Sequence, residues 1–135
     1  MRRANGYSLL ELVVVLGVAA LLAFVAAPAV GGWIDGATLR SDARTAMNEI
    51  RRLRDQALDR QTEIAVAVST GAAHVLTASN GEAIALSQGT SATGGGLAIA
   101  WDGTVAGRLA LRRGGTTLVV SADPLTGRLT VDGAR

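Results

Sequence analysis

The N-terminal part of the chain is a long run of apolar residues with one charge at its head. Leu12 to Val30 contains no charged residue and is built from Leu, Val, Ala, Gly, Phe and one Pro. Its length is close to the roughly 20 residues that a helix needs to cross a bilayer. We therefore predict a transmembrane helix over residues 7–30. A carboxylate at the centre of such a helix costs about 2.5–3.5 kcal/mol on insertion scales, and less near the boundary, so Glu11 is a candidate functional residue.

A second helical pattern follows. Gly31 and Gly32 interrupt the apolar run, and we predict an amphipathic helix within residues 31–62. Its apolar residues recur at spacings of three and four, which places them on one face: Leu39, Ala43, Met47, Ile50, Leu53 and Ala57. Charged residues fill the other positions, with opposite charges at helical spacing in Glu49 and Arg52 and in Arg51 and Asp55. Such a face is typical of a solvated surface; the alternative is that some of its arginines contact neighbouring subunits.

From Glu63 onward the apolar residues alternate with a period of two, which is typical of β-strands. Strand patterns lie around Ile64 to Val68, Val75-Leu76, Ile84 to Leu86, Leu97 to Trp101, Leu109 to Leu111, Leu118 to Val120 and Leu129 to Val131. Turn residues separate them: Asn80-Gly81, Asp102-Gly103, Gly114-Gly115 and Asp123-Pro124. Residues 88–96, rich in Gly, Ser and Thr, are predicted to form a flexible loop.

The predicted fold class is therefore α+β. A long N-terminal helix, transmembrane and then amphipathic, packs on a β domain of residues 63–135. We expect about seven short antiparallel strands in one or two sheets.

The excess of basic over acidic residues comes from the N-terminus. All 13 basic residues are arginines, against 11 acidic residues. Arg2 and Arg3 precede the apolar run, and by the positive-inside rule they hold the N-terminus in the cytoplasm. Without these two, the arginines and the acidic residues are equal in number. The excess positive charge therefore belongs to the short leader of residues 1–6.

The leader and the start of the apolar run resemble the processing motif of type IV prepilins and of type II secretion pseudopilins. Gly6 ends a short basic leader, Glu11 follows five residues later, and an apolar helix lies behind. The resemblance implies that a prepilin peptidase cuts between Gly6 and Tyr7 and methylates Tyr7 as the new N-terminus. Pro28 also resembles a proline that many pilins carry at this depth, where the helix kinks or melts.

The resemblance gives Glu11 a role in assembly. As the fifth residue of the mature chain it is expected to pair with an N-terminal amine, because opposite charges attract strongly in a low dielectric. That amine belongs either to Tyr7 of the same chain, one helical turn away, or to a neighbouring subunit. The second pairing would set the axial stagger between subunits.

The rest of the chain resembles the H-type minor pseudopilins. The similarity rests on Ala57-Leu58-Asp59-Arg60, on the Trp101-Asp102-Gly103 turn and on Leu125-Thr126-Gly127-Arg128-Leu129. Two departures are Trp101, where phenylalanine is frequent, and Gln61, where glycine is usual.

The implied function is that of a minor pseudopilin of a type II protein secretion system. It would assemble with major and minor pseudopilins into a periplasmic pseudopilus that drives folded proteins across the outer membrane. The implied location is the inner membrane, single-pass, with a cytoplasmic N-terminus and a periplasmic C-terminal domain. Prepilin peptidase, the inner-membrane assembly platform and membrane lipid are the other implied partners.

Two alternatives remain. In the first, Ala27-Pro28-Ala29 is the cleavage site of an ordinary secretory signal peptide.

In the second, the chain is a type IV pilus minor pilin involved in pilus assembly or DNA uptake, since related minor pilins bind DNA through basic C-terminal Gly-Arg repeats. Arginines outnumber acids in the C-terminal region: Arg108, Arg112, Arg113, Arg128 and Arg135 against Asp102, Asp123 and Asp132. Only one such Gly-Arg pair, Gly127-Arg128, lies near the end of the chain, and no aromatic stacking platform accompanies it, so nucleic acid is not an expected partner.

No enzymatic or cofactor-binding pattern stands out, and we expect neither activity nor cofactor. His74 has no cysteine or paired acid near it in the sequence and is predicted to be a half-exposed or core strand residue. Asp102, Asp123 and Asp132 are predicted to stabilise turns and are too dispersed for a calcium site. Gly94-Gly95-Gly96 lacks the lysine and helix of a phosphate-binding loop.

Overall fold

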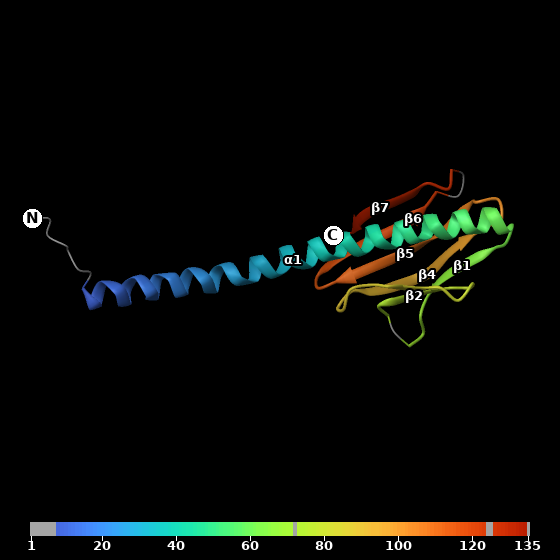
Figure 1. Ribbon diagram of the computed structural model, residues 1–135. Helices are drawn as coiled ribbons and strands as arrows, with labels where there is room; N and C mark the ends of the chain where they lie inside the picture. Colours follow the sequence, from blue (N-terminus) through green and yellow to red (C-terminus); the bar gives the residue numbers. More distant parts are fainter. Residues whose placement is uncertain (1–7, 72, 124–125, 135) are drawn as a thin grey trace, which may run out of the picture. The chain divides into compact units, whose positions relative to one another are not determined.

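A computed structural model describes residues 8–71, 73–123 and 126–134, apart from the side chains of Pro28 and Ala134. Its described part contains one helix, α1 (Leu9–Arg60), and seven strands: β1 (Ile64–Val68), β2 (Val75–Ala78), β3 (Ala83–Ala85), β4 (Ser91–Ile99), β5 (Val105–Arg113), β6 (Thr116–Ala122) and β7 (Leu129–Ala134). All seven strands form one antiparallel sheet in the order β3-β2-β1-β4-β5-β6-β7 (Figure 1). The α+β prediction is confirmed, with a single sheet.

The predicted long N-terminal helix is confirmed, and it continues through Gly31-Gly32, because α1 is helical from Leu9 to Arg60. A glycine inside a helix costs only about 1 kcal/mol relative to alanine, which the flanking helix formers offset. The chain divides into two compact units at this level, Met1–Trp33 and Ile34–Arg135. The second unit contains the sheet and the part of α1 that packs on it.

The helix ends two residues earlier than predicted. Gln61 adopts a φ of 48°, and Thr62 N–H donates to the carbonyl of Ala57 at 3.1 Å. Helices commonly end with one residue in the left-handed conformation, followed by a residue whose backbone N–H bonds back to the last turn. Glycine is the usual residue at the left-handed position. The unusual Gln61 therefore stands where glycine would be least strained.

One aliphatic core joins the helix to the sheet. The predicted helix face is confirmed, since Leu39, Ala43, Ile50, Leu53 and Ala57 are buried; Met47 lies partly buried at the edge. The sheet contributes the rest, including Ile64, Val66, Leu76, Leu97, Ile99, Val105, Leu109, Leu111 and Val120. Figure 1 shows the later turns of α1 lying along one face of the strands.

The loop predicted for residues 88–96 is wrong in its second half, because Ser91 to Gly96 belong to β4. The register of β4 against β5 shifts between Thr93 and Gly96, as in a β-bulge. Gly96 has a φ of 83°, and a Cβ there would collide with the carbonyl oxygen of Val66 in β1. The glycines therefore serve a bulge and a close backbone approach inside the sheet.

Candidate functional site

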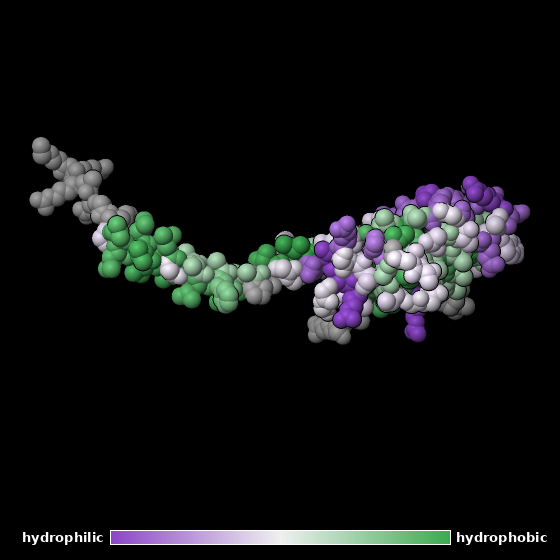
Figure 2. Space-filling model, turned by 90° about the horizontal axis from the view of Figure 1, so that it is seen from below, coloured by the Kyte–Doolittle hydropathy of each residue, from purple (hydrophilic) through white to green (hydrophobic). Residues whose placement is uncertain are grey.

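The part of α1 from Leu9 to Trp33 leaves its large apolar side chains uncovered. Large residues from Leu9 to Trp33 are at least half exposed, with Phe24 at 82% and Trp33 at 73%. This end of α1 is long and apolar enough to cross a membrane. Figure 2 shows hydrophobic side chains dominating this part of the surface, while hydrophilic ones gather on the domain.

Glu11 lies exposed in the first turn of α1. Its backbone N–H donates to the hydroxyl of Ser8 at 3.2 Å. Ser8 therefore caps the helix, and the Ser8-Leu9-Leu10-Glu11 spacing is that of a capping box. This second reason for a glutamate at position 11 was not predicted, although the serine three residues earlier is the sequence signal for it. Gly6 and Tyr7 lie outside the described residues, so their processing and the pairing of the Tyr7 amine with Glu11 stay predictions.

Asp42 attaches the helix to the loop before β4. It is 6% exposed and accepts three hydrogen bonds: from Ser87 N–H at 3.3 Å, Ser87 Oγ at 2.7 Å and Thr90 Oγ1 at 2.5 Å. A buried carboxylate is tolerated where donors replace its hydration. This contact joins residues more than 40 positions apart and was not predicted.

Arg113, at the end of β5, makes a second attachment close by. Its Nε donates to Asp35 Oδ1 at 2.8 Å, and its Nη1 donates to the carbonyl of Gln88 at 2.6 Å. Nη1 also lies 3.5 Å from Thr90 Oγ1. One guanidinium therefore connects the helix, the loop and the sheet, which uses the fork of donors that arginine provides.

A third attachment joins the helix to the β2–β3 hairpin on the surface. Arg52 donates to Glu49 at 2.7 Å, as predicted from their spacing, and to Glu82 at 2.6 Å. Gln56 donates to Glu82 Oε1 at 3.1 Å. The hydrogen bond from Gln56 lowers the pKa of Glu82 most, and the hydrogen bond from Arg52 lowers it further. The other predicted pair, Arg51 with Asp55, is not among the salt bridges of the described residues. Arg51 instead donates a hydrogen bond to the side-chain oxygen of Asn48 at 3.2 Å.

The C-terminal arginines do not form one patch. Arg108 and Arg112 alternate along β5 with buried Leu109 and Leu111, so they lie on the face away from the helix. Arg113 is paired with Asp35. Arg128 lies beside the helix, and Arg135 lies outside the described residues.

The remaining candidates have structural roles. His74 is exposed in the turn before β2, so the strand prediction is wrong there; its carbonyl accepts a hydrogen bond from Leu86 N–H at 2.8 Å.

Asp102 and Asp123 stabilise turns as predicted, since they accept the N–H groups of Thr104 at 2.9 Å and Thr126 at 3.3 Å. The hydroxyl and N–H of Thr104 lower the pKa of Asp102. Asp132 lies within β7 opposite Val119, so its predicted place in a turn is wrong.

Across the described ranges, no group of three or more His, Cys, Asp or Glu side chains could hold a metal ion. No protein-family model matches the chain, and comparisons with curated proteins and with solved structures likewise find no match. The case for a function therefore rests on the residues themselves.

Proposed function

We propose that the chain is a minor pseudopilin of a type II protein secretion system. It would be inserted in the inner membrane through α1, processed between Gly6 and Tyr7, and incorporated into a periplasmic pseudopilus with its β domain outside the membrane. The alternative within the same class is a minor pilin of a type IV pilus.

The observation that carries this proposal is the uncovered apolar helix with one carboxylate in its first turn. An exposed apolar surface of this extent marks contact with a membrane or with other proteins. A helix satisfies its own backbone hydrogen bonds in lipid, so Leu9 to Trp33 could be stable there without further structure. Glu11 then stands where a carboxylate needs a partner, and an N-terminal amine is the partner that the Gly6–Tyr7 processing motif would create.

The attachments between helix and sheet suit a subunit whose action is mechanical. Asp42 and Arg113 connect α1 to the loop before β4 and to the end of β5. Together with the aliphatic core they fix the sheet to the part of α1 that lies in the same unit, from Ile34 to Arg60. A filament that advances by adding helices at its base would thus carry the sheet domain outward.

Processing can be tested directly by mass spectrometry of the protein purified from membranes. The expected mature chain begins at a methylated Tyr7. A chain that begins at Val30 would instead support the signal-peptide alternative, and a chain that keeps Met1 would remove the prepilin hypothesis.

Secretion and pilus function can be separated by a second experiment. The division of the C-terminal arginines among different places supports secretion over DNA uptake, because fewer arginines can then neutralise the phosphates of one nucleic acid at the same time. An electrophoretic shift assay over a salt series is expected to show no binding. Retarded DNA that is released as salt rises would favour the pilus alternative.

A further inference from the structure

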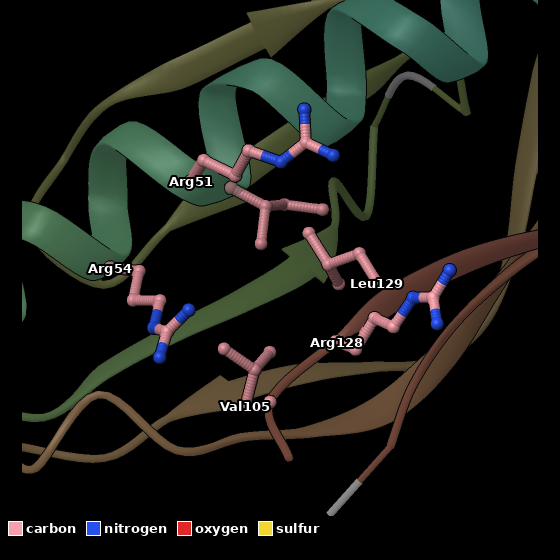
Figure 3. A pocket seen from close by; sticks show the side chains of 7 residues that line it. Arg51, Arg54, Val105, Arg128 and Leu129 are labelled. Atoms are coloured by element: carbon pink, nitrogen blue, oxygen red, sulfur yellow. The ribbon is translucent and has the colours of Figure 1, made fainter.

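A pocket of about 280 Å³ lies between α1 and the start of β7, within the sheet domain (Figure 3). Arg51 and Arg54 enter it from α1, and Arg128 enters it from the segment that leads into β7. Ile50, Val105 and Leu129 supply an aliphatic floor, and Gly127 completes the lining. The pocket is therefore cationic at its edges and apolar between them.

The three arginines of this pocket carry positive charge into a small space. Among the described residues, none of the three arginines forms an ion pair with an aspartate or glutamate. Arg51 has a neutral partner, the side-chain oxygen of Asn48. Three arginine side chains that line one small space raise its positive potential, which favours the binding of an anion.

Arg54 carries a more specific sign of a missing partner. Its Nε is buried and, within the part of the chain that the structure describes, has no hydrogen-bond acceptor. Buried donors are nearly always satisfied, because leaving one without an acceptor costs its full desolvation penalty. An oxygen atom entering the pocket would satisfy this donor.

Backbone geometry keeps the space beside Arg54 open. Gly127 has a φ of 64°, and a Cβ there would lie 3.5 Å from both Arg54 Nη2 and the carbonyl oxygen of Gly103. The left-handed conformation favours glycine. On this side the Arg54 side chain therefore lies against the backbone of Gly127, with no side chain between them.

We propose that the pocket binds the carboxylate of an aspartate or glutamate side chain from a protein partner. A carboxylate is the planar acceptor that guanidinium groups match best, and its aliphatic stem would contact Ile50, Val105 and Leu129. A nucleic acid fits less well, because Arg108 and Arg112 lie on the other face of the sheet and Arg113 is already paired with Asp35.

The neighbouring surface has the composition of a protein contact. Gly103 lies against Leu58 of α1 and near Gly127. Leu58 is 43% exposed, and Trp101 in the same turn as Gly103 is 62% exposed. Arginine and tryptophan are the residues most enriched where protein interfaces concentrate their binding energy. The pocket and this turn together offer a charged anchor beside an apolar contact.

The test uses the full-length, detergent-solubilised chain and the NMR signals of its arginine Nε–H groups. The probe is N-acetylglutamate N-methylamide, and the control is the glutamine analogue, which is isosteric and neutral. We expect the carboxylate to shift the Arg54 signal to saturation while the amide leaves it in place. Arg128→Gln should weaken this binding roughly two- to fivefold, and Arg108→Gln, on the other face, should leave it unchanged.

Three results would overturn the proposal. In the first, the glutamine analogue shifts Arg54 as much as the glutamate analogue does. In the second, Arg108 and Arg54 respond alike, so that the effect is only that of net charge. In the third, a single-stranded oligonucleotide at equal phosphate concentration shifts Arg54 more strongly, which would assign the pocket to nucleic acid. This readout does not depend on whether the chain is a pseudopilin.

Discussion

Thr90 donates its hydroxyl to Asp42 at 2.5 Å, joining two residues that are 48 positions apart in the chain. Both side chains are buried, with exposures of 2% and 6%. The bond fixes the loop before β4 against the middle of the helix.

Asp42→Ala is expected to destabilise the domain by about 2–3 kcal/mol, because it removes the acceptor of three hydrogen bonds and leaves the Thr90 hydroxyl buried without its carboxylate. Urea unfolding of the detergent-solubilised chain, followed by circular dichroism, measures this loss. Asp59→Ala, at an exposed position of the same helix, is the matched control and should change stability by less than about 0.5 kcal/mol. Equal stability of the two variants would contradict a stabilising role for Asp42.

Substitutions at Glu11 can distinguish the effect of its charge from its role in capping the helix. Glu11→Ala should leave cleavage intact but impair co-assembly with other pseudopilins. Glu11→Gln keeps a side chain that can complete the capping box but loses the charge. If an ion pair with an amine guides assembly, both variants should fail in co-purification and secretion assays.

Ser8→Ala is the companion variant for Glu11. It removes the cap, at a cost of about 1 kcal/mol to the helix end, but keeps the carboxylate. It should therefore assemble and secrete normally. A normal Glu11→Gln alongside a defective Ser8→Ala would reduce Glu11 to a capping residue.

Gly96→Ala should destabilise the sheet by about 1–3 kcal/mol, since the new Cβ would meet the Val66 carbonyl and the φ of 83° is strained for alanine. Gly95→Ala is its neighbouring control, because a Cβ there would have no heavy atom within 4 Å. Thermal unfolding compares the two. Similar melting temperatures would mean that β4 moves away from β1 without cost.

Gln61→Gly should stabilise the chain by about 0.5–1 kcal/mol, because glycine adopts the positive φ after Arg60 without strain, although its greater freedom in the unfolded chain offsets part of the gain. Gln61→Ala keeps the strain and should be close to neutral. Urea midpoints of the two variants check the prediction. A loss of stability in the glycine variant would show that the Gln61 side chain has a role of its own.

Acid should weaken the surface attachment at Glu82. Its pKa is lowered from the ordinary 4.5 by the hydrogen bonds from Gln56 and Arg52. A lowered folded-state pKa stabilises the protein above the unfolded value, and this contribution disappears as the pH falls from about 4.5 through the folded pKa. Urea midpoints should therefore fall on acidification, and fall less in Glu82→Gln. Asp102, whose pKa is also lowered, should leave a residual acid sensitivity in that variant.

The helix face and the number of strands could be predicted because they depend on local periodicity. The spacing from Leu39 to Ala57 and the alternation from Ile64 to Val131 are visible in the sequence, and burial follows the same periods as far as Leu129, while Val131 is exposed. The candidate residue Glu11 was likewise visible as a charge beside an apolar run.

The attachments could not be predicted, since they join residues that are distant in the chain. Asp42 in an amphipathic helix suggests a solvated charge, and only folding brings Ser87 and Thr90 to it. Gly94 to Gly96 were interpreted as a loop because glycine weakens a strand locally. In the sheet, the backbone of β4 lies so close to β5 at Gly94 and to β1 at Gly96 that a side chain at either position would be crowded. The three arginines of the pocket come from two segments more than 70 residues apart, so composition alone did not group them.

The three attachments are spaced along the helix at Asp35, Asp42 and Arg52. At a rise of about 1.5 Å per residue they extend over roughly 25 Å of helix. A pull along the helix axis would strain all three at once, in shear, while a force that lifted one end of the helix off the sheet would break them in succession. The domain should therefore withstand axial loading far better than peeling, and axial loading is what the proposed role in a growing filament would impose.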